Sequence, residues 1–328
     1  MEASCLTVIF VVVLRCTRCD ESPARLGALQ GLQPFGDLPM PSLLTETPVS
    51  TQRRMLNKVP EVTIYFWIIK VLATTVGETA ADLLSVTLHL GEAWTGVVMA
   101  AVLVVALFYQ FRARQYLPGI YWFSVVLISV VGTLLSDNLV DNLGVPLTVT
   151  TPVFGAALAG TFIAWYAREK TLSIHTIFST RREGFYWLTV LATFALGTSG
   201  GDFLSEALRW GYFNSLLIFA GGIGLVTAAY YILRINAVAA FWIAYVLTRP
   251  LGASLGDLMS QPHALGGLGL GTVWTSVAFL LAIVVLVTYL ALTKVDVTPT
   301  GTISASEAAQ DELQESSQTP VDLEPAGD

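Results

Sequence analysis

One pattern of residues occurs four times in this chain and constrains its fold more than any other feature. Each copy reads aromatic-Trp, nine residues, Gly, four residues, Asp, with no insertion or deletion between these positions. The copies are Phe66-Trp67…Gly77…Asp82, Tyr121-Trp122…Gly132…Asp137, Tyr186-Trp187…Gly197…Asp202 and Phe241-Trp242…Gly252…Asp257. A fixed spacing of this kind indicates an internal repeat, in which each copy is one supersecondary unit.

Every copy lies inside a long apolar run. The chain is 54% hydrophobic and only 12% charged, unlike an ordinary soluble protein. Eight runs are long enough, or nearly so, to cross the roughly 30 Å of hydrocarbon in a bilayer. These runs are residues 62–84, 94–111, 120–139, 145–166, 185–204, 212–233, 237–259 and 272–292. Because they lack the alternation of barrel strands, the sequence predicts an all-α integral membrane protein with eight transmembrane helices.

The membrane domain is expected to cover residues 58–294. The preceding residues 1–57 are rich in Pro and Gly and aperiodic, and the acidic tail 295–328 has few large apolar residues, so both are predicted to be disordered. Met55 stands just before the first convincing helix, and we expect it to be the natural start. All three cysteines fall within the first nineteen residues, so no disulfide or thiolate metal site is expected in the membrane domain.

The distances between motif glycines indicate how the repeat arose. They are 55, 65 and 55 residues, which suggests a helical hairpin that was duplicated twice into two pairs. The predicted repeats cover residues 61–111, 116–166, 181–233 and 236–293. Because each hairpin starts on the same side of the membrane, these are parallel repeats rather than inverted ones.

Basic residues predict the orientation. They lie before the first run and after every second run; the main ones are Arg53, Arg54, Lys58, Arg112, Arg114, Arg168, Lys170, Arg181, Arg182, Arg234 and Lys294. The positive-inside rule then places both termini in the cytoplasm. All four motif helices run outward in parallel, and their aspartates lie toward the extracytoplasmic end.

Charged residues separate the runs into two classes. The second, fourth, sixth and eighth runs contain no Asp, Glu, Lys or Arg. The other four runs and their outer ends contain Lys70, Glu78, Asp82, Asp137, Asp141, Asp202, Glu206, Arg249 and Asp257. A charge in hydrocarbon costs at least ~2.5–3.5 kcal/mol, so we expect the motif helices to line the centre and the uncharged helices to face lipid.

These charges predict a carboxylate site for a small hard cation, because oxygen ligands without Cys or His suit Mn²⁺, Mg²⁺, Ca²⁺, Na⁺ or H⁺. The expected primary ligands are Asp82, Asp137, Asp202 and Asp257. Glu78, Asp141 and Glu206 would extend the pathway, and Lys70 and Arg249 would supply counter-charge. The motif glycines Gly77, Gly132, Gly197 and Gly252 lie about 140° away from the aspartates around a helix, so they are expected to shape or pack helices rather than bind. The motif tryptophans are expected to anchor the inner half of the domain.

The leading hypothesis is therefore a transporter or channel for a small cation, with export of a divalent metal such as Mn²⁺ as one specific form. Its partners would be the bilayer and the transported cation, with no nucleic acid and no certain cofactor; self-association is left open. The alternative is a scaffold or sensor that transports nothing and uses its buried charges as salt bridges.

An enzyme is not expected. Intramembrane aspartyl proteases carry a Gly-x-Gly-Asp sequence, and the nearest matches here are Ser199-Gly200-Gly201-Asp202 and Ser254-Leu255-Gly256-Asp257, which both lack the first Gly. Four equivalent acids also fit a catalytic dyad poorly.

Several segments resemble a family of bacterial multi-span proteins described as uncharacterised membrane-anchored proteins. The segments are 58–62 (KVPEV), 75–82 (TVGETAAD), 136–146 (SDNLVDNLGVP) and 248–257 (TRPLGASLGD). The resemblance extends from Met55 to about Leu292. It implies a bacterial inner-membrane protein and brings no established activity with it.

Overall fold

The chain folds into two classes of long α-helix, which alternate along the sequence. The computed structural model describes residues 58–177 and 179–297; the predictions about Met55, the cysteines and most of the acidic tail lie outside these residues. The motif helices are α2 (Ile64–Asp82), α4 (Pro118–Asp137), α6 (Thr180–Asp202) and α8 (Ala237–Ser260). The helices between and after them are α3 (Glu92–Arg112), α5 (Leu147–Glu169), α7 (Tyr212–Leu233) and α9 (Thr272–Thr293). The described part of the chain is thus all-α, with eight long helices.

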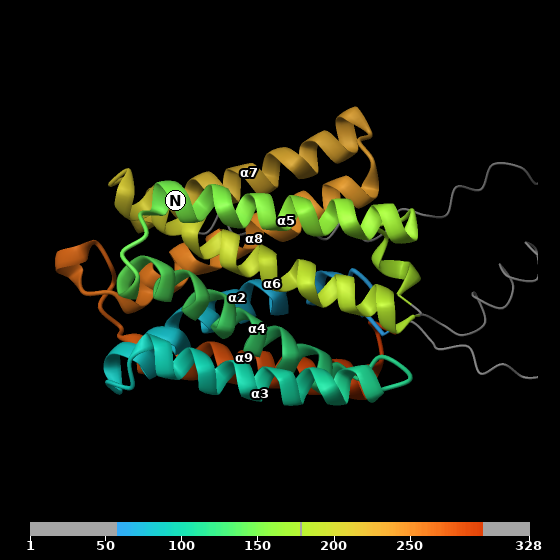
Figure 1. The fold of residues 1–328 in the computed structure, drawn as a ribbon, viewed down its shortest axis with the longest axis horizontal. Coiled ribbons are helices and arrows are strands. Elements are labelled where there is room, and N and C mark those ends of the chain that lie inside the picture. The colour runs from blue at the N-terminus through green and yellow to red at the C-terminus, as the bar shows by residue number, and fades with distance from the viewer. Residues whose placement is uncertain (1–57, 178, 298–328) are drawn as a thin grey trace, which may run out of the picture.

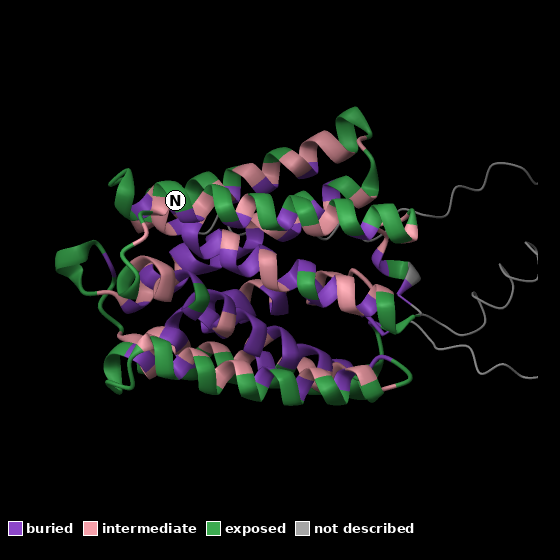
Figure 2. Cartoon of the chain, in the orientation of Figure 1, coloured by how far each residue is buried: buried purple, intermediate pink, exposed green. Residues whose placement is uncertain are grey.

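The motif helices form the centre of the molecule. They pack in a closed ring, α2 on α4, α4 on α6, α6 on α8 and α8 back on α2. Figure 1 shows them between α5 and α7 on one side and α3 and α9 on the other. In α2, 67% of the most apolar 18-residue stretch is buried, whereas the value for α3 is 22%. Figure 2 shows the same contrast, with buried residues on the inner helices and exposed ones along the outer helices. The separation of charged from uncharged runs in the sequence therefore corresponds to an inner and an outer layer.

The two helices of one repeat pack little on each other, an arrangement that the prediction of four helical hairpins did not specify. Instead, α3 packs on α4, α5 on α6, and α7 on α8, so each outer helix packs mainly on the motif helix of the next repeat. The last outer helix, α9, packs on α2 and closes the circle. A further turn and a short loop connect each of α2, α4 and α6 to the outer helix that follows it.

The motif glycines lie where neighbouring motif helices approach most closely. A Cβ atom on any of the four would come within 3.0 Å of a side chain on the next helix of the ring. Gly77 faces Ser129, Gly132 faces Phe194, Gly197 faces Arg249 and Gly252 faces Thr74. The faced residue is always three positions before the motif glycine of its own helix, so the four contacts repeat one another around the ring.

Three of the motif helices continue past their aspartate as a π-helical turn: η1 (Leu83–Thr87), η2 (Asn138–Asn142) and η4 (Phe203–Ala207). The bonds that define these turns include Leu88 N–H to the Leu83 carbonyl, 2.9 Å. By contrast, α8 continues as an α-helix to Ser260 and is followed by the short 3₁₀ turn η5 (His263–Leu265). A second 3₁₀ turn, η3 (Ile174–Thr176), lies between α5 and α6. The widened turns leave three of the four aspartates at a helix junction, where backbone hydrogen bonding is irregular.

Seven of the eight helices are long and apolar enough to cross a membrane, which suggests a multi-pass membrane protein. The exception, α6, begins with charged Arg181, Arg182 and Glu183 and is rich in Thr, Ser and Gly near its end. Large apolar side chains are exposed along the outer helices, for example Leu225 at 71%, Ile232 at 77% and Leu292 at 79%. Such a surface is unusual for a soluble monomer.

Candidate ion-binding site

A buried arginine lies near the centre of the ring. Arg249 on α8 is fully buried and donates from Nη2 to Glu78 Oε2 at 2.9 Å. The same nitrogen donates to Thr198 Oγ1 at 2.7 Å and to Thr133 Oγ1, while Nη1 donates to the Thr74 carbonyl at 3.2 Å. We call these five residues the arginine cluster. It joins all four motif helices, because a guanidinium offers donors in several directions at once.

The repeat explains how one arginine reaches so many partners. The residue directly after the motif glycine points into the ring in the first three copies. From the first copy to the fourth, these residues are Glu78, Thr133, Thr198 and Ala253. Arg249 contacts the first three of them, and the fourth, on its own helix, is small. Symmetry of the backbone therefore brings equivalent positions together, and differences in their side chains make the cluster polar.

Three carboxylates converge beside the arginine cluster. Glu78, Asp202 and Asp257 each offer one oxygen, and these oxygens lie within 4.8 Å of one another. We call these residues the carboxylate trio. Glu78 and Asp257 are buried, with exposed fractions of 6% and 7%, and Asp202 is partly buried. They come from α2, α6 and α8, so only the folded ring assembles them.

The dimensions of the trio suit a hard cation. Oxygen ligands lie about 2.0–2.1 Å from Mg²⁺ and about 2.3–2.6 Å from Ca²⁺, so two ligands on opposite sides of one ion are about 4–5 Å apart. Mn²⁺ accepts the same oxygen-rich environment. When all three acids are ionised, Arg249 balances one negative charge and two remain. A divalent cation would neutralise that excess, which is costly to bury otherwise.

The other acids expected at the site are arranged differently. Asp82 accepts a 3.4 Å hydrogen bond from Gln261, which directly follows α8, and is partly buried. Asp137, also partly buried, lies at the end of α4 within electrostatic range of Glu78 and Asp202. Asp141 and Glu206 are exposed in the π-helical turns. The structure therefore brings together two motif aspartates and Glu78, rather than all four aspartates.

The sequence predicted Lys70 as a counter-charge to the acids, but Lys70 lies away from the carboxylate trio. Its Nζ is fully buried and lies 3.9 Å from the ring centre of Phe194 and 4.2 Å from that of Tyr245. This nitrogen has no hydrogen-bond partner. Eight residues separate Lys70 from Glu78, about 12 Å along a helix, so its charge would act on the trio only through Arg249.

The motif aromatics form a closed collar on the N-terminal side of Lys70 along α2. Trp122 packs on Phe66, Trp187 on Tyr121 and Trp242 on Tyr186, with ring centres 5.4–6.3 Å apart. The circle closes where Trp67 packs on Phe241 at 5.7 Å. The tryptophans therefore serve to join neighbouring motif helices, and Trp122, Trp187 and Trp242 are buried. The sequence prediction placed them in the inner half but did not indicate that each would join two repeats.

Two buried polar pairs near the N-terminal ends of the motif helices were missed by sequence reasoning. Lys58 forms a 2.8 Å ion pair with Glu183, and both side chains are only 1% exposed. Tyr116 donates a 2.6 Å hydrogen bond to Asp296, which follows α9. Burial raises the pKa of Asp296 above its usual range, although the Tyr116 bond acts in the opposite direction. Both pairs join segments far apart in the sequence, so no local pattern could have indicated them.

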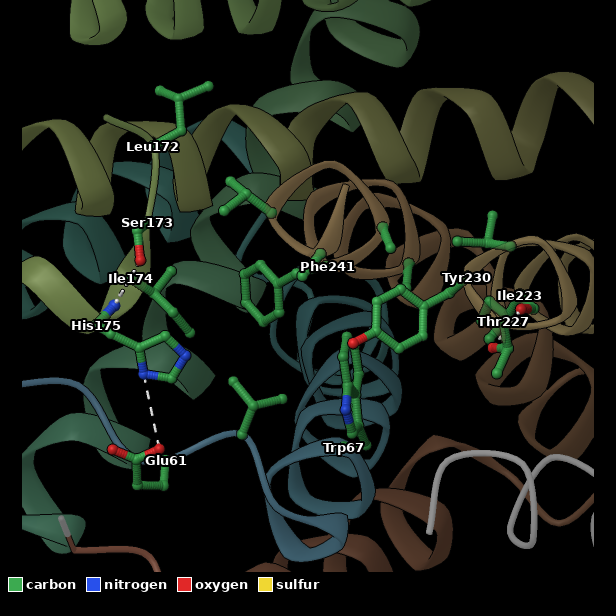
Figure 3. A pocket seen from close by; sticks show the side chains of 16 residues that line it. Glu61, Trp67, Leu172, Ser173, Ile174, His175, Ile223, Thr227, Tyr230 and Phe241 are labelled. Carbon is green, nitrogen blue, oxygen red and sulfur yellow. Dashed lines mark hydrogen bonds and ion pairs between the residues drawn. The ribbon is translucent and has the colours of Figure 1, made fainter. Parts of the chain in front are cut away.

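A separate pocket opens between α2, α7 and α8, near the N-terminal ends of α2 and α8. It has a volume of about 420 Å³ and is lined by Trp67, Tyr230 and Phe241 on one side. His175 and Glu61, whose Nδ1 and Oε2 atoms are 3.6 Å apart, lie on the other side (Figure 3). Along α2, Trp67 is eleven residues from Glu78, about 16 Å. The pocket is therefore distinct from the carboxylate trio.

Comparison with known proteins identifies the repeat. Neither the curated proteins nor the solved structures include a match to this chain. One family model matches four times, over residues 65–116, 120–171, 185–236 and 240–296. Each match covers one motif helix and the outer helix that follows it, which confirms the internal repeat predicted from the sequence. The chain belongs to the family described as Repeat of Unknown Function (DUF347).

Proposed function

We propose that this protein is a multi-pass membrane transporter or channel for a small hard cation, and that the carboxylate trio is its ion site. The observation that carries the proposal is the convergence of Glu78, Asp202 and Asp257 within 4.8 Å in a largely buried position. Ionisable residues inside membrane helices are costly and commonly mark ion pathways. A divalent metal such as Mn²⁺ is the favoured substrate, because Arg249 leaves two negative charges of the ionised trio unbalanced. Export from the cytoplasm is the direction we favour.

The expected setting is the inner membrane of a bacterium, with both termini in the cytoplasm. Support comes from the basic residues at the ends of the outer helices. Lys170, Arg234 and Lys294 follow α5, α7 and α9 directly and adopt left-handed backbone conformations there. Positive charge at the C-terminal end of a helix interacts favourably with the helix dipole, and its position on one side of the bundle favours the cytoplasmic face.

The test is ion flux in vesicles that contain the purified protein. Flux would be measured for Mn²⁺, Mg²⁺ and Na⁺, with and without a pH gradient. Asp202→Asn and Asp257→Asn each remove one ligand, and Glu169→Gln is the control because Glu169 lies at the C-terminal end of α5, outside the ring of motif helices. We expect flux of at least one divalent ion, lost in the first two variants and retained in the control.

The alternative is a scaffold or sensor, and the Arg249–Glu78 pair is the observation that favours it. Both residues are buried and hydrogen-bonded, as in a structural ion pair. The two functions predict opposite effects of Asp257→Asn on stability. In a scaffold this acid contributes to folding, so its loss lowers the unfolding temperature. In an ion site, neutralising one of three crowded carboxylates relieves repulsion and leaves the unfolding temperature equal or higher.

A further inference from the structure

Lys70 is a buried titratable group that the carboxylate site does not use. Its Nζ is enclosed by the rings of Phe194 and Tyr245 and has no hydrogen-bond partner. In such a place the faces of the aromatic rings stabilise the ammonium form of lysine. The neutral amine form is favoured in turn because no water solvates the charge. Lysine, unlike arginine, can exchange between these forms in proteins.

The charged groups near Lys70 are few. Among the residues that the structure describes on α2, α4, α6, α8 and α9, only Arg249 acts on it electrostatically. The carboxylates of Glu78 and Asp202 lie beyond Arg249, on its outer side. Toward the inner side, α8 contributes the titratable hydroxyl of Tyr245, and α6 and α4 contribute further tyrosines. Arg249 therefore separates a lysine from the carboxylates.

A line of buried tyrosines connects Lys70 with the inner end of the bundle. We call it the tyrosine file; its members are Tyr245, Tyr186, Tyr121 and Tyr116. The Tyr245 hydroxyl, next to Lys70, is buried without a hydrogen-bond partner among the described residues, and the hydroxyls of Tyr186 and Tyr121 are 2.5 Å apart. The rings of Tyr121 and Tyr116 are 5.6 Å apart. Tyr116 bonds to Asp296, whose raised pKa favours a bound proton.

The tyrosine file is not a consequence of the repeat. At the first motif position, Tyr121 and Tyr186 carry hydroxyls, while the first and fourth copies have Phe66 and Phe241. At the position of Lys70, the fourth copy has Tyr245 and the other two have valine. These polar side chains lie next to each other around the ring, although the four copies have the same backbone arrangement. Hydroxyls in contact can pass a proton, because each both accepts and donates.

We propose that Lys70 is a proton-exchanging residue that couples cation movement to proton movement in the opposite direction, and that the tyrosine file connects it to the inner face. This inference rests on the proposed function and adds the counter-ion to it. A cation in the carboxylate trio and a proton on Lys70 oppose each other, because both place positive charge beside Arg249. Such opposition is reciprocal: each ligand weakens the binding of the other.

The proton balance is simple. When a cation binds the trio, the Lys70 ammonium releases one proton to the tyrosine file and becomes an amine. Each hydroxyl accepts one proton and gives up its own, so the file ends unchanged and one proton leaves through Asp296. When the cation leaves on the outer side, one proton enters from that side and restores the Lys70 ammonium, so one proton crosses the membrane inward for each cation that crosses outward. No other reactant is consumed.

The test uses the full chain in vesicles of phosphatidylethanolamine and phosphatidylglycerol, with a pH-sensitive dye inside and the membrane potential clamped. Mn²⁺ uptake would be measured once under a pH gradient alone and once under a Mn²⁺ gradient at equal pH. Lys70→Gln has no exchangeable charge, and Lys70→Arg keeps a positive charge that does not titrate. Tyr186→Phe interrupts the file, and Tyr109→Phe is its control because Tyr109 is 60% exposed on α3.

We expect both Lys70 variants to lose uptake driven by the pH gradient by about tenfold or more. Uptake down the Mn²⁺ gradient should stay within about twofold of the native rate in Lys70→Gln and should fall in Lys70→Arg, whose fixed charge opposes the cation. Tyr186→Phe should slow proton movement and Tyr109→Phe should not. Native protein that carries Mn²⁺ without moving protons would overturn the coupling and leave the proposed function standing. Coupling that survives in Lys70→Arg would overturn the role of Lys70. Absence of any cation flux in native protein would overturn both proposals.

Discussion

The Arg249 guanidinium donates a 2.9 Å hydrogen bond to the Glu78 carboxylate, although these residues come from the last and first of the four repeats. The bond forms because α8 packs back on α2 and closes the ring of motif helices. It therefore depends on the complete set of repeats. Three further oxygens, from Thr74, Thr133 and Thr198, accept from the same guanidinium.

Removing either partner of this pair should destabilise the fold. Arg249→Met leaves Glu78 as a buried charge without its main partner. Glu78→Gln leaves the Arg249 guanidinium as a buried charge without its carboxylate partner. Each is expected to cost about 3–5 kcal/mol. The double variant should cost less than the sum of the two, as determined from unfolding in detergent. Strictly additive effects would show that the pair contributes nothing as a pair.

The motif glycines should not tolerate a methyl group. A Cβ at Gly132 would lie 2.6 Å from the Phe194 Cβ and 3.2 Å from the Ala195 backbone nitrogen. Gly132→Ala is therefore expected to cost about 1–3 kcal/mol through overpacking. Gly160→Ala on α5 is the matched control, since no atom beyond its own helical turn lies within 4 Å of the added Cβ. Equal unfolding temperatures for the two variants would contradict the close approach of α4 and α6.

Sequence reasoning predicted the repeat, the helical class and the inner and outer layers, because each follows from spacing or local composition. It could not identify the partners of Lys70 and Arg249. Grouping residues four apart places Lys70, Glu78 and Asp82 on one stripe of α2, but it contains no information on which residues of α6 and α8 face that stripe. The structure turns Lys70 toward Phe194 and Tyr245, whereas Glu78 meets Arg249.

The carboxylate trio was only partly predictable for a related reason. The repeat made the four motif aspartates equivalent, so a fourfold set was the natural expectation. The fourth copy continues as a regular helix past Asp257, while the others change to π-helical turns after their aspartates. Glu78 has no acidic counterpart in the other copies, which carry Thr133, Thr198 and Ala253 at that position. Differences between copies, rather than the repeat itself, select the trio.

The stability of the inner end should depend on the protonation of Asp296. Its pKa is raised by burial in the folded protein, so the proton is held more tightly there than in the unfolded chain. The contribution to stability is present below the ordinary pKa of aspartate and is lost as the pH rises through the raised value. Asp296→Asn keeps an acceptor for Tyr116 and should flatten this part of the dependence of unfolding temperature on pH. An unchanged profile would contradict the assignment.

Two histidines at opposite ends of the bundle offer positions for a cysteine-labelling test of the orientation. The described residues contain no cysteine of their own that would react. His175 lies in the turn between α5 and α6, and His263 follows α8 at the opposite end. In a chain whose three native cysteines are changed to serine, His263→Cys should react with an impermeant maleimide from outside the cell. His175→Cys should react only after the membrane is opened. The reverse pattern would invert the proposed topology.

The central claim is that the carboxylate trio binds a hard cation, and Mn²⁺ binding to the purified protein tests it most directly. Titration followed by calorimetry, with Mn²⁺ paramagnetic resonance as a second measure, would compare native protein with Asp202→Asn, Asp257→Asn and the control Glu169→Gln at the C-terminal end of α5. We predict one saturable site per chain, weakened about tenfold or more when either buried aspartate is neutralised and unchanged in the control. Binding that is absent from the native protein, or equal in all four proteins, would contradict the claim.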